Sequence, residues 1–182
     1  MRVIVLSHFH ADHIGGLLDF PRARFVFFES SWRAVRDLRG FSALRRGFLP
    51  GLLPPDFSER AAPLDTTRPR ALPPELAPFG CGHDILGDGS MLAVELAGHA
   101  AGQMGLVLRL RSGALWFLVA DACWTSRCYR ERIKPHPLTR LLFDDTLEYC
   151  RTLDRISDLH ERSPEIRIVP SHCSEVLAET GP

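Results

Sequence analysis

The feature that most constrains this chain is a block of potential metal ligands close to its first residue. His8, His10, Asp12 and His13 follow the apolar run 3–6. That run predicts a buried strand, and side chains two positions apart on an extended backbone point the same way, so His8 and His10 can face one centre. Imidazole and carboxylate groups are ligands that Zn²⁺, Mn²⁺ and Fe²⁺ accept. A packed core has no use for such a cluster unless it is paired or binds a metal, so the block predicts a metal site where a strand ends.

The spacing within this block resembles the signature of the metallo-β-lactamase superfamily of hydrolases, in its lactonase-like or glyoxalase II-like branch. The resemblance extends over nearly the whole chain, because three further ligand positions follow in the order that the superfamily uses. Each of them comes at the end of an apolar run that predicts a strand. These positions are His99 after residues 93–97, Asp121 after residues 115–120 and His172 after residues 166–171.

By analogy with the superfamily, the candidate ligands divide into two metal sites that share one carboxylate. His8, His10 and His99 would hold the first ion, Asp12, His13 and His172 would hold the second, and Asp121 would bridge them. The resemblance implies two zinc ions per chain, with iron or manganese as alternatives. Two ions about 3.5–4 Å apart can share a water and lower its pKa toward roughly 7, which makes a bridging hydroxide the nucleophile. Asp12 and Asp121 are therefore the catalytic candidates. For Asp12 two roles stay open, as a ligand alone or as a ligand that also orients the hydroxide.

The fold that the resemblance implies is an α/β (α+β) αββα sandwich, in which two mixed sheets pack together with helices outside. A chain of 182 residues suits one domain, so we expect a single metallo-β-lactamase-like domain over residues 1–182. Members of the superfamily usually place several strands before the histidine motif, whereas here the motif strand begins at residue 2. We therefore expect an incomplete N-terminal half-sheet with an open apolar edge. A fragment, a misassigned start or completion of the sheet by a partner would each explain it.

Further strand and helix signals lie between and after the ligand positions. An Asp-Gly pair at residues 88–89 between apolar flanks predicts a hairpin. Apolar residues at three-residue steps predict one long helix over residues 144–162 that packs on the core. The remaining predicted elements are helices at 14–20 and 32–39, and strands at 23–28, 104–111, 115–120 and 166–170.

Residues 41–79, which we call the proline-rich segment, contain eight prolines and predict irregular structure. The prolines are Pro50, Pro54, Pro55, Pro63, Pro69, Pro73, Pro74 and Pro78. A loop of this length inside a compact domain is usually functional or disordered, and apolar residues such as Phe48 and Phe57 argue against a simple linker. Two hypotheses stay open. The segment forms a lid over the metal site and builds the acyl or leaving-group pocket, or it caps the core and touches no substrate.

Composition narrows the partners and the cellular location. The formal net charge is zero, which argues against a nucleic acid held through its phosphates. No run approaches the ~18 apolar residues of a membrane span, and the N-terminus does not look like a signal peptide. The cysteines are odd in number and show no disulfide framework, so we expect reduced thiols in a cytoplasmic protein. The expected partner is a small-molecule substrate, with no nucleic acid or membrane, and a homodimer is left open.

The ligand set by itself serves lactones, thioesters, β-lactams and phosphodiesters. The short tail after His172 leaves no room for the C-terminal substrate domain of glyoxalase II relatives, and the apolar lid and the lactonase-like hairpin favour a small ester, lactone or thioester. Lactonases of the superfamily often place Tyr three residues after the bridging Asp, where this chain has Trp124. An indole N–H donates a hydrogen bond but cannot shuttle a proton, which argues against a specific homoserine-lactonase assignment.

Three alternatives to this hydrolase remain from the sequence. One is a phosphodiesterase with the same motif. Another is an oxygenase of the persulfide dioxygenase type, which uses a similar ligand set at a single iron. The third is a non-catalytic, truncated member that binds metal without turnover.

Overall fold

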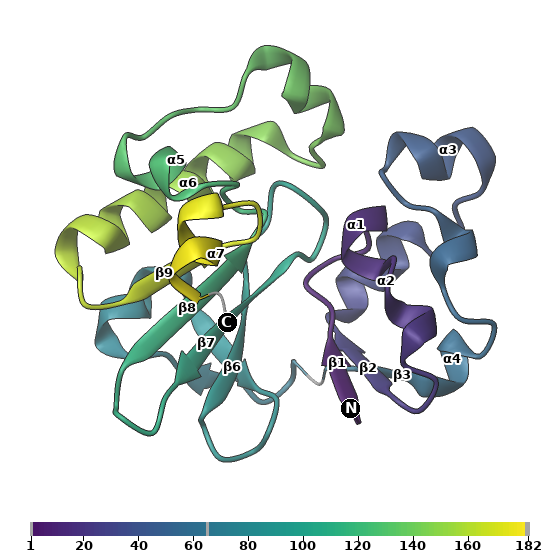
Figure 1. Ribbon diagram of the computed structural model, residues 1–182, viewed down its shortest axis with the longest axis horizontal. Coiled ribbons are helices and arrows are strands. Elements are labelled where there is room, and N and C mark those ends of the chain that lie inside the picture. Colours follow the sequence, from purple (N-terminus) through teal and green to yellow (C-terminus); the bar gives the residue numbers. More distant parts are fainter. Residues whose placement is uncertain (1, 65, 181–182) are drawn as a thin grey trace.

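The computed structural model describes residues 2–64 and 66–180, and its strands form two sheets (Figure 1). The first sheet is parallel, in the order β1 (Val3–Val5), β2 (Arg24–Phe27) and β3 (Ala61–Pro63). The second sheet has six strands in chain order, antiparallel except for the parallel pair β8–β9. These strands are β4 (Arg70–Ala71), β5 (Cys81–Asp84), β6 (Met91–Glu95), β7 (Met104–Arg109), β8 (Leu115–Ala120) and β9 (Arg167–Pro170). We call residues 2–64 the first half and residues 66–180 the second half.

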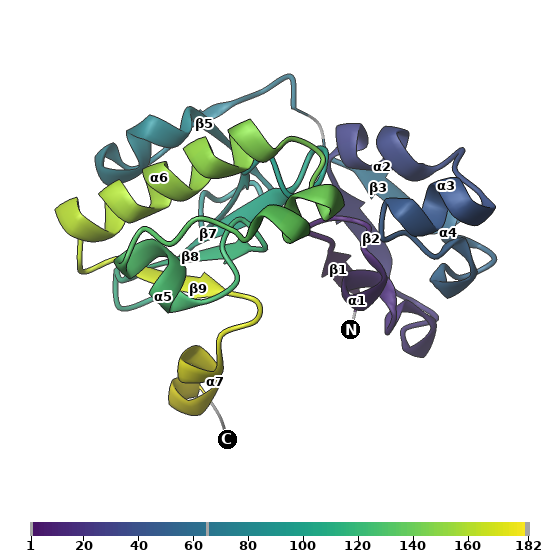
Figure 2. The same cartoon turned by 90° about the horizontal axis from the view of Figure 1, so that it is seen from above.

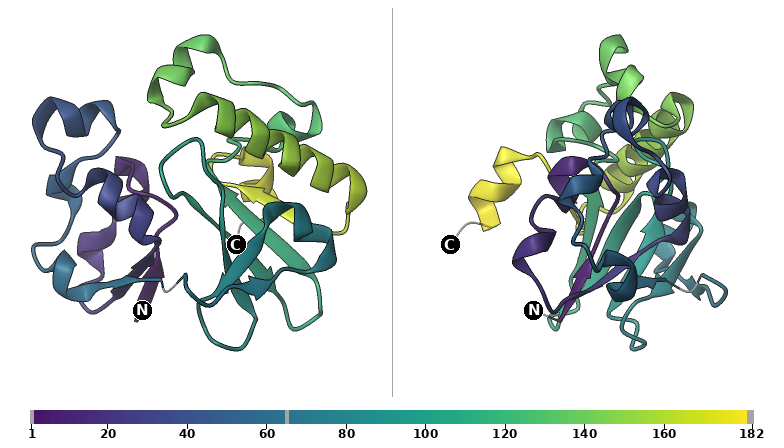
Figure 3. Two further views of the ribbon diagram at one scale, coloured as in Figure 1. Left: turned by 180° about the vertical axis from the view of Figure 1, so that it is seen from behind. Right: turned by 90° about the vertical axis from the view of Figure 1, so that its right-hand side faces the viewer.

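Each sheet has its own helices. The two halves lie beside one another (Figures 2 and 3). The helices of the first half are α1 (Ala11–Ile14), η1 (Leu17–Asp19), α2 (Glu29–Val35), α3 (Gly40–Arg45), η2 (Pro50–Leu52) and α4 (Phe57–Arg60). Those of the second half are η3 (Pro74–Phe79), α5 (Ser126–Arg130), η4 (Pro137–Leu142), α6 (Thr146–Arg162) and α7 (Ser174–Thr180). Across the described ranges, no helix is long and apolar enough to cross a membrane.

The long helix α6 covers one face of the six-stranded sheet. Its Leu153, Ile156 and Leu159 are fully buried in one cluster with Phe117 of β8. The predicted apolar stripe therefore lies against the core from Leu153 to Leu159, whereas Leu147 at its start is 61% exposed. The helix starts two residues later than predicted, because the Asp145 side chain accepts hydrogen bonds from the first-turn N–H groups and so caps the helix.

The predicted strands and the hairpin are confirmed, while two short helices differ from their predicted ranges. The hairpin joins β5 to β6 around the predicted Asp-Gly turn. The predicted helix 14–20 is instead α1 followed by the separate 3-10 turn η1, and α2 ends before Arg36 rather than at residue 39. The mixed α/β architecture confirms the predicted fold class.

The prediction that residues 3–6 form a buried strand is wrong in part. Leu6 is buried, but the Val3 side chain is 45% exposed, because β1 pairs only with β2 among the described strands. A cavity of about 250 Å³ lies between β1 and the faces of β7, β8 and β9. An apolar run indicates burial only if another element covers it, and among the described strands β1 is the edge of its sheet.

The proline-rich segment is not irregular, which corrects that prediction. It contains α3, α4, β3, β4 and η3, and it supplies Phe48 and Phe57 to the core of the first half and Leu76 to that of the second. Pro50 and Pro74 stand at the first position of η2 and η3. Proline is compatible with the first position of a helix, because its missing N–H would have no partner within the helix there.

Candidate metal centre

The histidine block lies where the chain changes from an extended strand to a helix. β1 ends at Val5, the chain bends at Ser7, and His10, the N-cap residue of α1, has extended backbone, while Asp12 and His13 lie within α1. The Met104 N–H donates to the Ser7 carbonyl at 2.8 Å, which ties this loop to β7 of the second half. The change of backbone therefore turns one block of sequence toward two different centres.

The first centre consists of three histidines, which we call the first donor group: His8, His10 and His99. One nitrogen of each lies within 4.8 Å of the others, and His99 Nε2 is 2.9 Å from His10 Nδ1. His8 is fully buried, and its Nε2 has no hydrogen-bond partner in the part of the chain that the structure describes. A buried nitrogen without a partner is costly unless a cation occupies that position, so this donor set fits a metal ion.

The second centre, which we call the second donor group, contains two carboxylates and two imidazoles. Asp12 and His13 come from α1, Asp121 follows β8, and His172 follows β9. His13 Nε2 is 3.2 Å from Asp121 Oδ1, and His172 Nε2 is 3.5 Å from Asp12 Oδ2. Mixed nitrogen and oxygen donors with this spacing suit Zn²⁺, Mn²⁺ or Fe²⁺.

The carboxylate of Asp121 lies between the two groups. Its Oδ2 is 3.3 Å from His99 Nε2 in the first group and 3.3 Å from His172 Nε2 in the second. The side chain is buried, which is unusual for a carboxylate unless cations or donors surround it. The structure thus brings all seven predicted ligand positions together, with Asp121 where a bridging ligand would stand.

Ser7 orients two of the imidazole rings, a role that the sequence reasoning missed. Its Oγ is 3.1 Å from His8 Nδ1 and 3.1 Å from His13 Nδ1. With the Nδ1 atoms engaged, the Nε2 atoms are the ones through which both rings can bind a metal. Partners of this kind fix the tautomer and the ring orientation of metal-binding histidines. A hydroxyl residue directly before the block was the only available signal in the sequence.

Burial sets the protonation states of the first group. Burial lowers the pKa of His10, lowers that of His99 to about 4, and, with the neighbouring imidazoles, lowers that of His8 well below its usual value. In the second group, burial alone would lower the pKa of His13, but the contact with Asp121 outweighs it and raises the pKa. The same contact outweighs burial at Asp121 and lowers its pKa. Neutral imidazoles and an ionised carboxylate are the forms that bind metal.

Residues from both halves enclose the first group. Gly47, in the proline-rich segment, packs against His10 so closely that a Cβ atom would lie 2.9 Å from the ring. Its neighbour Arg46 forms an ion pair with Asp144, whose N–H donates to the His99 carbonyl at 3.1 Å. In the proline-rich segment, for which one hypothesis was a lid, Arg46 and Gly47 lie beside the ligands. Much of the rest of the segment packs in the two cores.

An aromatic wall lies on the other side of His99. The rings of Trp124 and Phe143 are centred 6.3 and 5.4 Å from the His99 ring. Trp124 occupies the position where the lactonases of the superfamily often have Tyr. This difference from those lactonases therefore lies beside the candidate metal centre.

A mixed α/β fold in which a three-histidine group and a His/Asp group meet at one buried carboxylate provides two candidate sites for divalent metal ions. The chain belongs to the metallo-β-lactamase superfamily, whose sequence profile matches residues 2–162. The predicted family and the sandwich fold are confirmed, and so is the lactonase-like branch.

Curated relatives are N-acyl homoserine lactonases. AiiB of Agrobacterium fabrum is 29% identical over 190 residues, which cover 96% of this chain and 58% of the relative. AttM of Azorhizobium caulinodans is 26% identical over 172 residues, which cover 90% and 55%. This chain therefore spans little more than half the length of the relatives that it matches.

Solved structures share the fold at low sequence identity. An N-acyl homoserine lactone hydrolase with N-hexanoyl-L-homoserine bound at its catalytic metal centre has a TM-score of 0.63 at 15% identity, over 98% of this chain and 58% of that one. AidC, a dizinc quorum-quenching lactonase, has a TM-score of 0.63 at 16% identity, over 96% and 58%.

Proposed function

We propose that this chain is a zinc-dependent hydrolase of a small lactone, ester or thioester, whose two donor groups would hold the two ions that supply an activated water for attack on the carbonyl carbon. The observation that carries this proposal is the buried Asp121 carboxylate, which lies 3.3 Å from a histidine of each donor group. When bound, two divalent cations lower the pKa of a shared water and polarise a carbonyl oxygen.

The side chains divide the remaining tasks between them. In the proposal, His8, His10 and His99 hold one ion and Asp12, His13 and His172 hold the other. The Asp12 side chain is 58% exposed, while its Oδ2 lies 3.6 Å from His13 Nε2. An exposed carboxylate beside the ligands can accept a hydrogen bond from the attacking water, so Asp12 is proposed to orient it as well as to bind metal.

Two observations support a small neutral substrate. Trp124 and Phe143 give the first group an apolar wall, which suits an acyl chain better than a phosphate. The relatives named above are lactonases, and the zero net charge of the chain offers no field that would attract a phosphodiester. A lactone is therefore the first substrate class to test.

The test starts with the metal content of chelator-washed and zinc-reconstituted protein, measured by elemental analysis. We expect close to two zinc ions per chain, and hydrolysis of an acyl lactone, a p-nitrophenyl ester or a thioester in preference to bis(p-nitrophenyl) phosphate. His8→Ala should lose metal and activity, and the exposed His136→Ala serves as the matched control.

Other outcomes would replace the proposal. One iron per chain would indicate the oxygenase chemistry, and preferred cleavage of the phosphodiester would indicate a phosphodiesterase. Folded, zinc-loaded protein that cleaves none of these substrates would indicate a metal-binding chain without turnover.

A further inference from the structure

We infer that Ser126 and Cys173 are positioning residues that hold His172 and Asp121 together in the second donor group. The inference rests on the proposed metal centre. His172 needs such support, because it lies on the loop between β9 and α7 and its side chain is 48% exposed. An exposed ligand on a loop binds a metal well only if other contacts fix its position.

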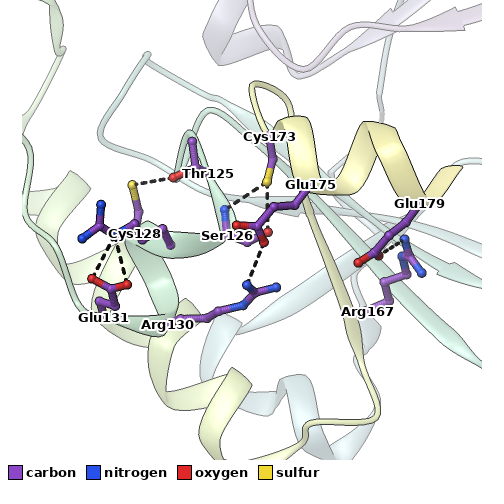
Figure 4. Close-up of polar contacts among 10 residues, drawn as sticks. Thr125, Ser126, Cys128, Arg130, Glu131, Arg167, Cys173, Glu175 and Glu179 are labelled. Carbon is purple, nitrogen blue, oxygen red and sulfur yellow. Dashed lines mark hydrogen bonds and ion pairs between the residues drawn. The ribbon is translucent and has the colours of Figure 1, made fainter. Parts of the chain in front are cut away.

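The contacts join the two loops that carry these ligands (Figure 4). The Ser126 N–H donates to Cys173 Sγ at 3.3 Å, and Ser126 Oγ lies 3.1 Å from the same sulfur. Cys173 directly follows His172, and Ser126 is the first residue of α5, five positions after Asp121. Both residues are buried, so water does not compete for these hydrogen bonds.

The thiol is not itself one of the donors. No Sγ atom belongs to either donor group among the described residues, and Cys173 Sγ is instead contacted by Ser126 and by the backbone N–H groups of Glu175 and Val176. The sulfur instead satisfies the Ser126 N–H, which lies in the first turn of α5 and has no acceptor within that helix. The contact therefore acts on the metal centre only through the backbone of its neighbour His172.

The other polar anchors of this segment are weaker. Arg130 pairs with Glu175 and Arg167 pairs with Glu179, each at 2.7 Å, but all four side chains are at least one-third exposed. Exposed ion pairs contribute little, because water screens them. Helix α7 projects away from the sheet in two views (Figures 2 and 3), so the anchors next to the ligand are the buried sulfur contact and the backbone hydrogen bond from the Ser171 N–H to the Ala120 carbonyl at 3.3 Å.

The test measures metal affinity rather than turnover. Co²⁺ is titrated into the metal-free full chain as wild type, Cys173→Ala, Cys173→Ser and Ser126→Ala, and the visible absorption of each equivalent is followed. We expect Cys173→Ala to weaken binding of one of the two ions by about 10–100-fold, the effect typical of partners of metal ligands, and to leave the other unchanged. Cys173→Ser keeps a hydrogen-bonding atom and should recover much of the loss. Glu179→Gln, which breaks an exposed pair on the same segment, is the matched control.

Several results would overturn the inference. Wild-type affinity for both ions in Cys173→Ala would do so, as would equal weakening of both ions or a Cys173→Ser variant no better than Cys173→Ala. Wild-type protein that binds fewer than two ions would overturn it together with the metal centre. Selective loss of one ion in a protein that cleaves no lactone, ester or thioester would instead support the inference while contradicting the proposed hydrolase.

Discussion

The two donor groups meet at one carboxylate but differ in their exposure to water. The first group has three imidazoles, of which His8 is fully buried and His99 nearly so. The second has two carboxylates and two imidazoles, and about half of the Asp12 and His172 side chains is exposed. Burial keeps the first group neutral and preformed, whereas the second carries charge and faces solvent. The buried first centre is therefore suited to holding its ion, whereas the second centre is open to solvent.

The difference arises from the backbone and not from the order of the ligands. His8 and His10 lie on the loop between β1 and α1, while Asp12 and His13 lie in the helix α1 that begins at Ala11. Helical backbone points successive side chains about 100° apart, so the last two donors turn away from the first two. Four neighbouring residues thereby serve two centres of opposite character.

Removing the carboxylate that the two groups share should have the largest effect, because it disturbs both groups at once. Asp121→Asn keeps the size of the side chain but removes the charge that both groups contact. We expect kcat/KM on the best lactone to fall by about 10³-fold, since metal-based stabilisation is worth several kcal/mol, and the metal content to fall as well. Kinetics and elemental analysis check both effects.

The control for this change is Asp88→Asn, which alters an exposed carboxylate on the hairpin between β5 and β6. It should leave activity and metal content unchanged. If Asp121→Asn retained two ions and full activity, Asp121 would have no bridging role.

Acid should affect the two groups differently, because the pKa values of the first group's histidines are lowered whereas that of His13 in the second group is raised. The folded chain lowers the pKa of His99 to about 4, so between the usual 6.5 and about 4 the unfolded chain binds more protons. The free energy of unfolding of the metal-free chain should therefore fall as the pH falls through this window, by about 3 kcal/mol from His99 alone. The raised pKa of His13 acts in the other direction and offsets part of this loss.

Urea unfolding at several pH values between 7.5 and 4.5 measures this effect. His99→Asn should give a shallower dependence on pH than the wild type. A stability that does not change across the window would show that burial does not hold these imidazoles neutral.

Partial metal removal should separate the two groups. Because Asp12 and His172 are half-exposed and His8 is buried, dialysis against a chelator should release the ion of the second group first. The metal content, followed over time by elemental analysis, should then show a plateau near one ion per chain. Simultaneous loss of both ions would mean that the shared Asp121 couples the groups more strongly than burial separates them.

Breaking the ion pair that joins the two halves should have the smallest effect. Arg46 pairs with Asp144 beside the first group, but both side chains are partly exposed. Exposed pairs contribute less than about 1 kcal/mol, so Arg46→Ala should lower the free energy of unfolding by less than that amount. Urea unfolding of Arg46→Ala, Asp144→Ala and the double variant isolates the pairwise energy. A coupling of several kcal/mol would show that this pair holds the halves together.

Much of this architecture could be predicted because its signals are local. The spacing of the ligand block, the Asp-Gly turn at residues 88–89 and the apolar period of α6 each act within a few residues. Local backbone geometry decides such features, so the paired strands, the hairpin and the long helix were predicted correctly.

The proline-rich segment and the exposure of β1 were predicted wrongly for a shared reason. Whether Phe57 or Val3 is covered depends on elements far away in the chain, and an apolar or proline-rich stretch does not reveal them. Proline content indicated loops, whereas Pro50 and Pro74 in fact start helical turns.

By itself, the sequence determined the family, the candidate ligands and their order along the chain. Only the tertiary structure decided which ligands share a centre, how exposed each centre is, and which partners orient them. The pairs Arg46–Asp144 and Ser126–Cys173 join residues 98 and 47 positions apart. Such contacts form only when the core brings distant segments together, because no local backbone preference encodes them.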